Sequence, residues 1–219
     1  RQILGWTNEL YPSTPTQYNP WVYIGTDNEL WVVDPYNGGG NQFSLTLTPG
    51  WHTLVVGDYF SGGTYYVIAY LDSTSNSNSS AITSLTMMFG WNGPFPYNYI
   101  GTAYTSNRPY VPSGAWFFYN GTIQYIAIYA GNTSTLENYL TNWLNTEGSN
   151  PSALPPSNLG VYGPYAEYTV QSFQGSVWYD ESGNNNYATL VSGTSPASVA
   201  TINATLSLGS LAPPLQTLK

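Results

Sequence analysis

Short runs of apolar, aromatic and β-branched residues recur along this chain, and each run ends at glycine, proline, asparagine or aspartate. A run of about five residues between such breakers is typical of a strand, whereas a helix needs a longer stretch. The clearest runs are residues 21–25, 30–33, 43–47, 52–56 and 64–71. The pattern predicts an all-β fold, an antiparallel β-sandwich or barrel.

Residues 134–147 depart from this pattern and have helical spacing. Ser134 and Glu137 form a capping-box sequence, and Gly148 follows the segment. The apolar residues expected on one face are Leu136, Tyr139, Leu140, Trp143 and Leu144. We therefore expect one short helix, packed on a sheet edge.

Three further segments carry turn or loop signals. Asn120-Gly121 separates the runs 115–119 and 122–129, which predicts a hairpin. Residues 73–80 (STSNSNSS) are polar and of low complexity, which predicts a loop before a strand at 81–89. Residues 90–114 are rich in proline, glycine, asparagine and tyrosine, which predicts a long loop.

Charged residues make up only 6% of the 219 residues, and the formal net charge is −8. Three cationic side chains are too few to neutralise a run of phosphates or to hold the chain on an anionic membrane. No apolar segment approaches the roughly 18 residues that a membrane-spanning helix needs. We expect no nucleic-acid partner and no membrane insertion.

With 42% hydrophobic residues the chain can bury a core and fold. Because it has few charged residues to expose, amide and hydroxyl groups must cover its surface. Carboxylates lose their charge near pH 4, so a surface of this kind suits an acidic or hot medium. There are no cysteines, so packing or assembly has to supply the stability that disulfides often give to secreted proteins. We expect an extracellular protein at the cell surface.

Groups for catalysis are scarce. His52 is the one histidine, and neither a cysteine nucleophile nor a Gly-x-Ser-x-Gly elbow occurs. The acidic residues are few and scattered, so they predict neither a metal site nor a paired-carboxylate glycosidase site. We expect a protein that is not an enzyme, with no catalytic residue, metal or cofactor.

Two groups of residues are candidates for attachment of, or contact with, carbohydrate. Asn-x-Ser/Thr sequences, the acceptors of N-glycosylation, occur at Asn78, Asn120, Asn132 and Asn203. Trp91 and Tyr97 belong to an aromatic cluster in residues 91–104 that either stacks on sugar rings or packs within its own loop.

Three segments carry a resemblance to a known family. They are residues 49–56 (PGWHTLVV) with the later Asp72, residues 120–129 with the helix start at 134–137, and residues 178–190 (WYDESGNNNYATL). Together they resemble the concanavalin A-like, laminin G-like sandwich family. The resemblance implies a jelly-roll-like sandwich and a role in glycan or protein adhesion. The glycine that follows the aspartate in the family is missing after Asp72, and so is the Glu-x-Asp-x-x-Glu strand of the hydrolase branch.

The order of these segments differs from that of the family, because the opening segment, 178–190, follows the closing helix. The expected organisation is a main sandwich at 1–147, a proline-rich linker at 148–159, and strands at 160–219 that complete the same or a neighbouring sandwich. A circular permutation, a cut from a tandem array, or strand donation between subunits each explains this order.

The tail at 198–211 alternates apolar and hydroxyl residues over about ten positions, which is a strand pattern. It is either the last strand of its own domain or a donor strand for a neighbour. The candidate donor residues are Val199, Ile202, Ala204, Leu206 and Leu208.

These features predict a secreted structural subunit of a cell-surface filament, which assembles with identical subunits by strand exchange and serves adhesion. The composition also resembles that of archaeal surface-filament and surface-layer proteins. The alternative is a carbohydrate-binding, lectin-like adhesin module of a cell or a virus.

Overall fold

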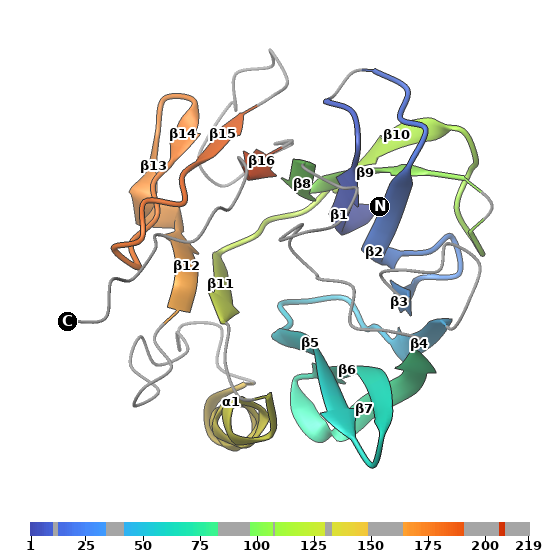
Figure 1. Cartoon of the computed structure of the whole chain (residues 1–219), viewed down its shortest axis with the longest axis vertical. Coiled ribbons are helices and arrows are strands. Elements are labelled where there is room, and N and C mark those ends of the chain that lie inside the picture. Colours follow the sequence, from blue (N-terminus) through green and yellow to red (C-terminus); the bar gives the residue numbers. More distant parts are fainter. Residues whose placement is uncertain are drawn as a thin grey trace.

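The computed structural model describes residues 1–10, 13–33, 42–82, 97–106, 108–129, 133–148, 164–190 and 206–208. Most of these residues lie in strands, with one α-helix, α1 (Thr133–Glu147), and a short 3₁₀ turn at Val170–Ser172. Every strand pair is antiparallel. The prediction of an all-β antiparallel sandwich with one short helix is confirmed (Figure 1).

The strands are β1 (Gln2–Thr7), β2 (Tyr18–Ile24), β3 (Glu29–Val33), β4 (Gln42–Thr46), β5 (Leu54–Ser61), β6 (Thr64–Leu71), β7 (Ser73–Ile82), β8 (Tyr97–Ile100), β9 (Thr102–Thr105), β10 (Ala115–Phe118), β11 (Tyr125–Tyr129), β12 (Pro164–Thr169), β13 (Phe173–Gln174), β14 (Val177–Trp178), β15 (Ala188–Leu190) and β16 (Leu206–Leu208). A nine-stranded sheet has the order β13-β14-β15-β16-β8-β1-β2-β3-β4. Smaller sheets are formed by β5-β6-β7, by β9-β10 and by β11-β12.

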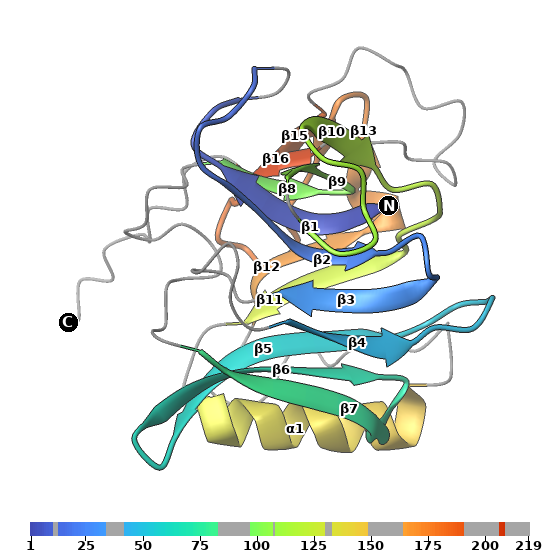
Figure 2. The same cartoon turned by 90° about the vertical axis from the view of Figure 1, so that its right-hand side faces the viewer.

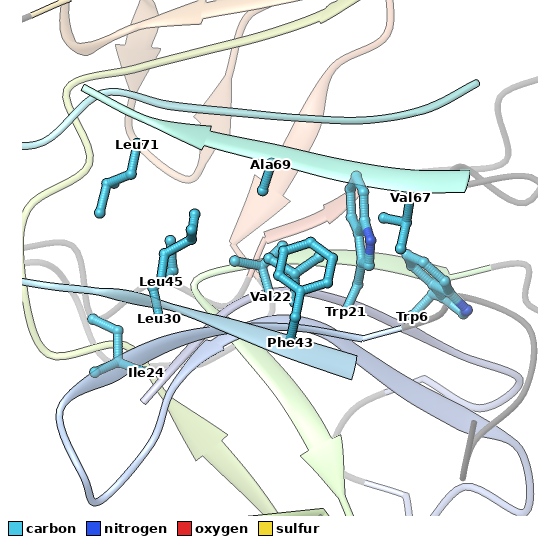
Figure 3. Close-up of a cluster of buried hydrophobic side chains, with 11 residues drawn as sticks. Trp6, Trp21, Val22, Ile24, Leu30, Phe43, Leu45, Val67, Ala69 and Leu71 are labelled. Carbon is cyan, nitrogen blue, oxygen red and sulfur yellow. The ribbon is translucent and has the colours of Figure 1, made fainter. Parts of the chain in front are cut away.

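The main core lies between the β1–β4 part of the large sheet and the β5-β6-β7 sheet. Alternate residues of β6 point into it, because successive side chains of a strand lie on opposite faces. Figure 3 shows Val67, Ala69 and Leu71 of this strand facing the side chains of the large sheet. The buried residues of the opposite layer are Trp6, Trp21, Val22, Ile24, Leu30, Val32, Phe43 and Leu45. Burial of these side chains at about 25 cal/mol per Å² of apolar surface is the main force that holds the two layers together.

The helix covers the outer face of the β5-β6-β7 sheet (Figure 2). Leu136 and Leu144 are buried as expected, whereas Tyr139, which was predicted on the same face, is 48% exposed. The hydroxyl of Tyr70 in β6 donates a hydrogen bond to the Glu137 carboxylate. Tyr70 reaches the helix because it alternates with the inward-facing Ala69 and Leu71. The helix therefore packs across a sheet face and not only on an edge.

A second core holds the C-terminal strands. Its buried residues are Ile100, Ile128, Ala166, Tyr168, Trp178 and Ala188. They belong to the β11-β12 ribbon and to β8, β14 and β15 of the large sheet, so the ribbon packs against the part of that sheet that lies beyond β1.

The prediction of a loop at residues 73–80 is wrong, because they form most of β7. This strand pairs with β6 over its length, from Tyr65 opposite Ile82 to Leu71 opposite Ser73. Backbone hydrogen bonds do not need apolar side chains, and an edge strand can expose serine and asparagine to solvent. Asn145 of α1 also accepts hydrogen bonds from the amide and hydroxyl of Thr74, at 3.1 and 2.8 Å. Of the strand expected at 81–89, only 81–82 lie within the described residues.

The hairpin predicted at Asn120-Gly121 is also wrong. The strand before it, β10, pairs with β9, and the strand after it, β11, pairs with β12. The two strands diverge because each finds its partner elsewhere, and the Tyr119 amide donates to the Gly101 carbonyl at 2.7 Å. A local turn signal was thus overridden by long-range pairing.

The long loop predicted at 90–114 contains β8 and β9. Their residues, 97–105, lack proline and include tyrosine, isoleucine and threonine, all of which favour strands. Of the linker expected at 148–159, only Gly148 is described. Beyond it, β12 pairs with β11, so strands from both sides of the linker share one ribbon.

Candidate functional site at a central strand position filled by the chain tail

The short strand β16 lies in the interior of the largest sheet, between β15 and β8 (Figure 1). It joins the five strands β8-β1-β2-β3-β4 to the three strands β13-β14-β15. A strand from late in the sequence therefore bridges two groups of strands that are otherwise not paired with each other in this sheet.

The register of β16 is defined on both sides. Leu206 lies opposite Ile100 of β8, and Leu208 lies opposite Ala188 of β15. Ser207 lies opposite Tyr99 on one side and Thr189 on the other. Ile100 and Ala188 are buried in the second core, so the register puts the two leucine positions on the sheet face that carries this core.

Removal of β16 would leave two open edges, those of β8 and β15. Unpaired strand edges accept another strand, either from the same chain or from another copy. In the structure the chain itself fills this position, so the sheet needs no outside strand here. Donation to a neighbour would therefore be an exchange, in which one copy of 206–208 replaces another.

Asp180 fixes the position of β15, one of the two strands that pair with β16. One carboxylate oxygen accepts the Glu167 and Ser182 amides, both at 2.9 Å, and the other accepts the Asn186 amide at 2.8 Å. The Asp180 side chain is almost fully buried. It holds the loop that leads into β15 against β12, and so determines where β15 presents its edge.

Side chains of the same loop add further bonds to β12. Ser182, Asn184 and Asn186 all donate to the Tyr165 carbonyl oxygen, at 3.1, 3.1 and 2.7 Å. Burial raises the pKa of Tyr168, and the charge of Asp180 raises it further, so this hydroxyl stays protonated and donates to the Asn186 carbonyl. The sequence resemblance singled out this segment, but residue spacing did not reveal its role as the support of β15.

Two of the five candidate donor residues, Leu206 and Leu208, lie in β16. Val199, Ile202 and Ala204 lie outside the described residues. The residues that receive β16, such as Tyr99 and Ile100, were missed because the segment was read as part of a loop. Its strand-forming composition, free of proline, was the available signal.

Two of the predicted glycosylation acceptors are described. Asn78 is exposed on β7, where its side-chain oxygen accepts the Ser79 amide at 2.8 Å. Asn120 is exposed between β10 and β11. Asn132 and Asn203 lie outside the described residues.

The side chains of the two predicted sugar-stacking residues lie outside the described part of the structure. Trp91 lies outside the described residues, and only the backbone of Tyr97 is described, opposite Thr7 of β1.

Within the described parts of the chain, histidine and acidic side chains form no cluster of three that could bind a metal ion. In the same residues, no helix is both long and apolar enough to cross a bilayer. His52 contacts Asp72 and the Thr48 carbonyl, a pairing that joins two strand ends.

Comparison with known proteins adds no relative to this picture. No protein-family model matches the chain, and no curated protein or solved structure matches it either.

Proposed function

We propose that this protein is a structural subunit of an extracellular filament on a cell surface, that identical subunits join by exchanging the C-terminal strand, and that the filament serves adhesion. In this proposal the chain is not an enzyme. The observation that carries it is the position of β16, a late strand that fills an interior gap of the sheet between β8 and β15.

Exchange of this strand would conserve its interactions. A second copy of 206–208 offers the same backbone donors and acceptors to Tyr99 and Thr189, in the same register. The free-energy difference between the closed and exchanged forms then depends on the reach of the tail and on subunit concentration more than on new contacts. Head-to-tail exchange does not close into a ring unless the rotation allows it, so it produces a filament.

The surface composition supports an extracellular setting. Amide and hydroxyl groups replace charge, and the exposed Asn78 and Asn120 lie in sequences that accept N-linked glycans. The low fraction of charged residues, 6%, makes the stability of such a subunit depend little on ion pairs.

Mixing two single-cysteine variants tests the exchange directly, because the natural chain has no cysteine. Thr189 is exposed and lies opposite Ser207, a spacing that permits a disulfide between cysteines. Chains with Ser207→Cys are mixed with chains carrying Thr189→Cys, allowed to assemble, and oxidised. We expect disulfide-linked dimers on a non-reducing gel and fibres by negative-stain electron microscopy.

The control pairs Ser207→Cys with Thr146→Cys, an exposed position on α1, and should give no such dimers above background. A double variant that carries both Ser207→Cys and Thr189→Cys locks the tail into its own chain when oxidised before assembly. It should then form no fibres until it is reduced. Monomeric protein with no linked dimers in the first mixture would rule the proposal out.

A further inference from the structure

Three side chains meet around Gly25, just after the end of β2, and one of them comes from a distant part of the sequence. Asp27 and Trp31 come from the β2–β3 turn and from β3, and Tyr110 comes from the segment between β9 and β10. A Cβ atom at Gly25 would lie 2.3 Å from Asp27 Oδ1, 3.0 Å from Tyr110 Cβ and 3.1 Å from Trp31 Cδ1. Only glycine leaves room for all three, so the cluster is tightly built.

Backbone contacts hold the two segments together. The Thr26 amide donates to the Tyr110 carbonyl at 2.7 Å, and the Tyr23 hydroxyl donates to the Pro109 carbonyl at 3.2 Å. Tyr110 has a φ of 55°, in the left-handed region that bulky side chains rarely adopt. Strain of this kind persists where surrounding contacts enforce it, and such places are often binding sites.

The strained backbone leaves the Tyr110 ring 54% exposed beside a fixed tryptophan. The centroids of Tyr110 and Trp31 are 5.5 Å apart, with an interplanar angle of 31°. Trp31 also stacks with the buried Tyr23, at 6.4 Å and 10°. Trp31, which is only partly exposed, is thus held between its contacts with Tyr23 and Tyr110, and Tyr110 is the aromatic residue of this cluster that is exposed to solvent.

A carboxylate lies beside these aromatic rings in a fixed orientation. The Trp31 indole Nε1–H donates to both oxygens of Asp27, at 3.3 and 3.1 Å, and the Glu29 amide donates to Oδ1 at 3.2 Å. A carboxylate offers about four acceptor sites, so the exposed Asp27 can still accept hydrogen bonds from a ligand.

We propose that Tyr110, Trp31 and Asp27 bind a neutral pyranose ring of a glycan. One face of such a ring carries C–H groups that stack on an aromatic face, whose electron density is negative. Its rim carries hydroxyls that donate to a carboxylate. The negative charges of Asp27 and of Glu29, the first residue of β3, disfavour an anionic sugar, and so does the net charge of −8. A single exposed tyrosine beside a partly buried tryptophan does not enclose a quaternary ammonium group, which favours the sugar over a cation.

This site is independent of the filament proposal, because no residue of β16, β8 or β15 belongs to it. The test is binding to a printed array of neutral oligosaccharides that end in glucose, galactose, mannose or N-acetylhexosamine. The best binder is then titrated in solution by calorimetry.

Tyr110→Asn should weaken binding by about tenfold or more, because it removes the stacking ring. Asparagine tolerates a positive φ, so the variant should keep the wild-type melting temperature. Asp27→Asn should weaken binding about tenfold, since it loses charge-assisted hydrogen bonds. Tyr139→Ala, which removes a similarly exposed tyrosine on α1, is the matched control and should bind like wild type.

The proposal fails if no neutral glycan on the array binds, or if Tyr110→Asn binds as tightly as wild type. It also fails if choline binds at this cluster and the neutral sugars do not. Chemical-shift changes of the Trp31 indole N–H on titration, assigned with Trp31→Phe, locate the bound sugar.

Discussion

His52 and Asp72 form a pairing that joins the entry of β5 to the end of β6. Nδ1 of His52 lies 2.7 Å from Oδ2 of Asp72, and Nε2 lies 2.6 Å from the Thr48 carbonyl oxygen. The other Asp72 oxygen accepts the Thr53 amide at 2.8 Å, with Asp72 itself at a φ of 64°. A carboxylate and a carbonyl only accept hydrogen bonds, so both are made when His52 is doubly protonated.

The stability of this protein should therefore decrease as pH rises past neutrality. Burial lowers the pKa of His52, but the hydrogen bonds to Asp72 and Thr48 outweigh it and raise the pKa above its ordinary value. A pKa that is higher in the folded than in the unfolded state stabilises the folded protein at pH values below the unfolded-state pKa. This stabilisation is lost as pH rises through the folded-state pKa. The pair is partly exposed, so we expect a loss of about 1 kcal/mol between about pH 5 and pH 8.5.

Urea denaturation at both pH values, on wild type and on His52→Gln, measures this loss. Subtracting the pH-dependent change in the variant's free energy of unfolding from that of wild type removes the contributions of all other groups, including the amino terminus. The same change with pH in both proteins would show that His52 contributes nothing.

Asp180 should be one of the most sensitive positions in the molecule. Asp180→Ala leaves the Glu167, Ser182 and Asn186 amides without their acceptor in a nearly buried site. We expect a loss of about 3 kcal/mol in the free energy of unfolding, measured by urea denaturation. Glu181→Gln, at the exposed neighbouring position, should change it by less than about 0.5 kcal/mol. A loss for Asp180→Ala as small as that of the control would contradict this role.

Gln2 offers a route to higher stability. Its side chain is fully buried in β1, and within the described residues neither amide atom has a hydrogen-bond partner. Methionine has a similar shape and no such desolvation cost, so Gln2→Met should raise the free energy of unfolding by about 1–2 kcal/mol. Gln174→Met, on the exposed β13, is the control and should have little effect. A destabilised Gln2→Met protein would indicate that the amide is satisfied in solution.

Local sequence pattern predicted β2, β3, β4 and β6 of the main core because each carries its own signal, but it did not single out β1. Residues 64–71 coincide with β6, and the helix starts one residue before Ser134. The pattern failed where pairing decides structure. The serine- and asparagine-rich β7 is a strand because β6 pairs with it, and Asn120-Gly121 makes no hairpin because both flanking strands have distant partners.

The two candidate sites differ in how far the sequence could reveal them. Alternation in the tail indicated a strand that includes Leu206 and Leu208, but its partners Tyr99 and Thr189 are set by tertiary pairing. Asp27, Trp31 and Tyr110 had no sequence signal in common, because 79 positions separate Trp31 from Tyr110 (110 − 31). Only the folded backbone, with Gly25 between them, brings the three together.

Proline in the middle of β16 should separate the role of this strand from that of the tail as a whole. Ser207 lies between Tyr99 and Thr189, and proline there removes a backbone donor and does not fit the interior of a sheet. We expect Ser207→Pro to reduce the fraction of protein that pellets as fibres by about tenfold or more, whereas Ser207→Thr, which favours strands, should leave it unchanged.

Hydrogen exchange on the same variants reports on the sheet independently of fibre formation. In Ser207→Pro, amides of β8 and β15 should lose protection because both edges open, while amides in the β5-β6-β7 sheet keep theirs. Loss of protection without loss of fibres would mean that β16 completes the sheet but is not the element exchanged between subunits. Loss of both is expected if the position between β8 and β15 is where one subunit joins the next.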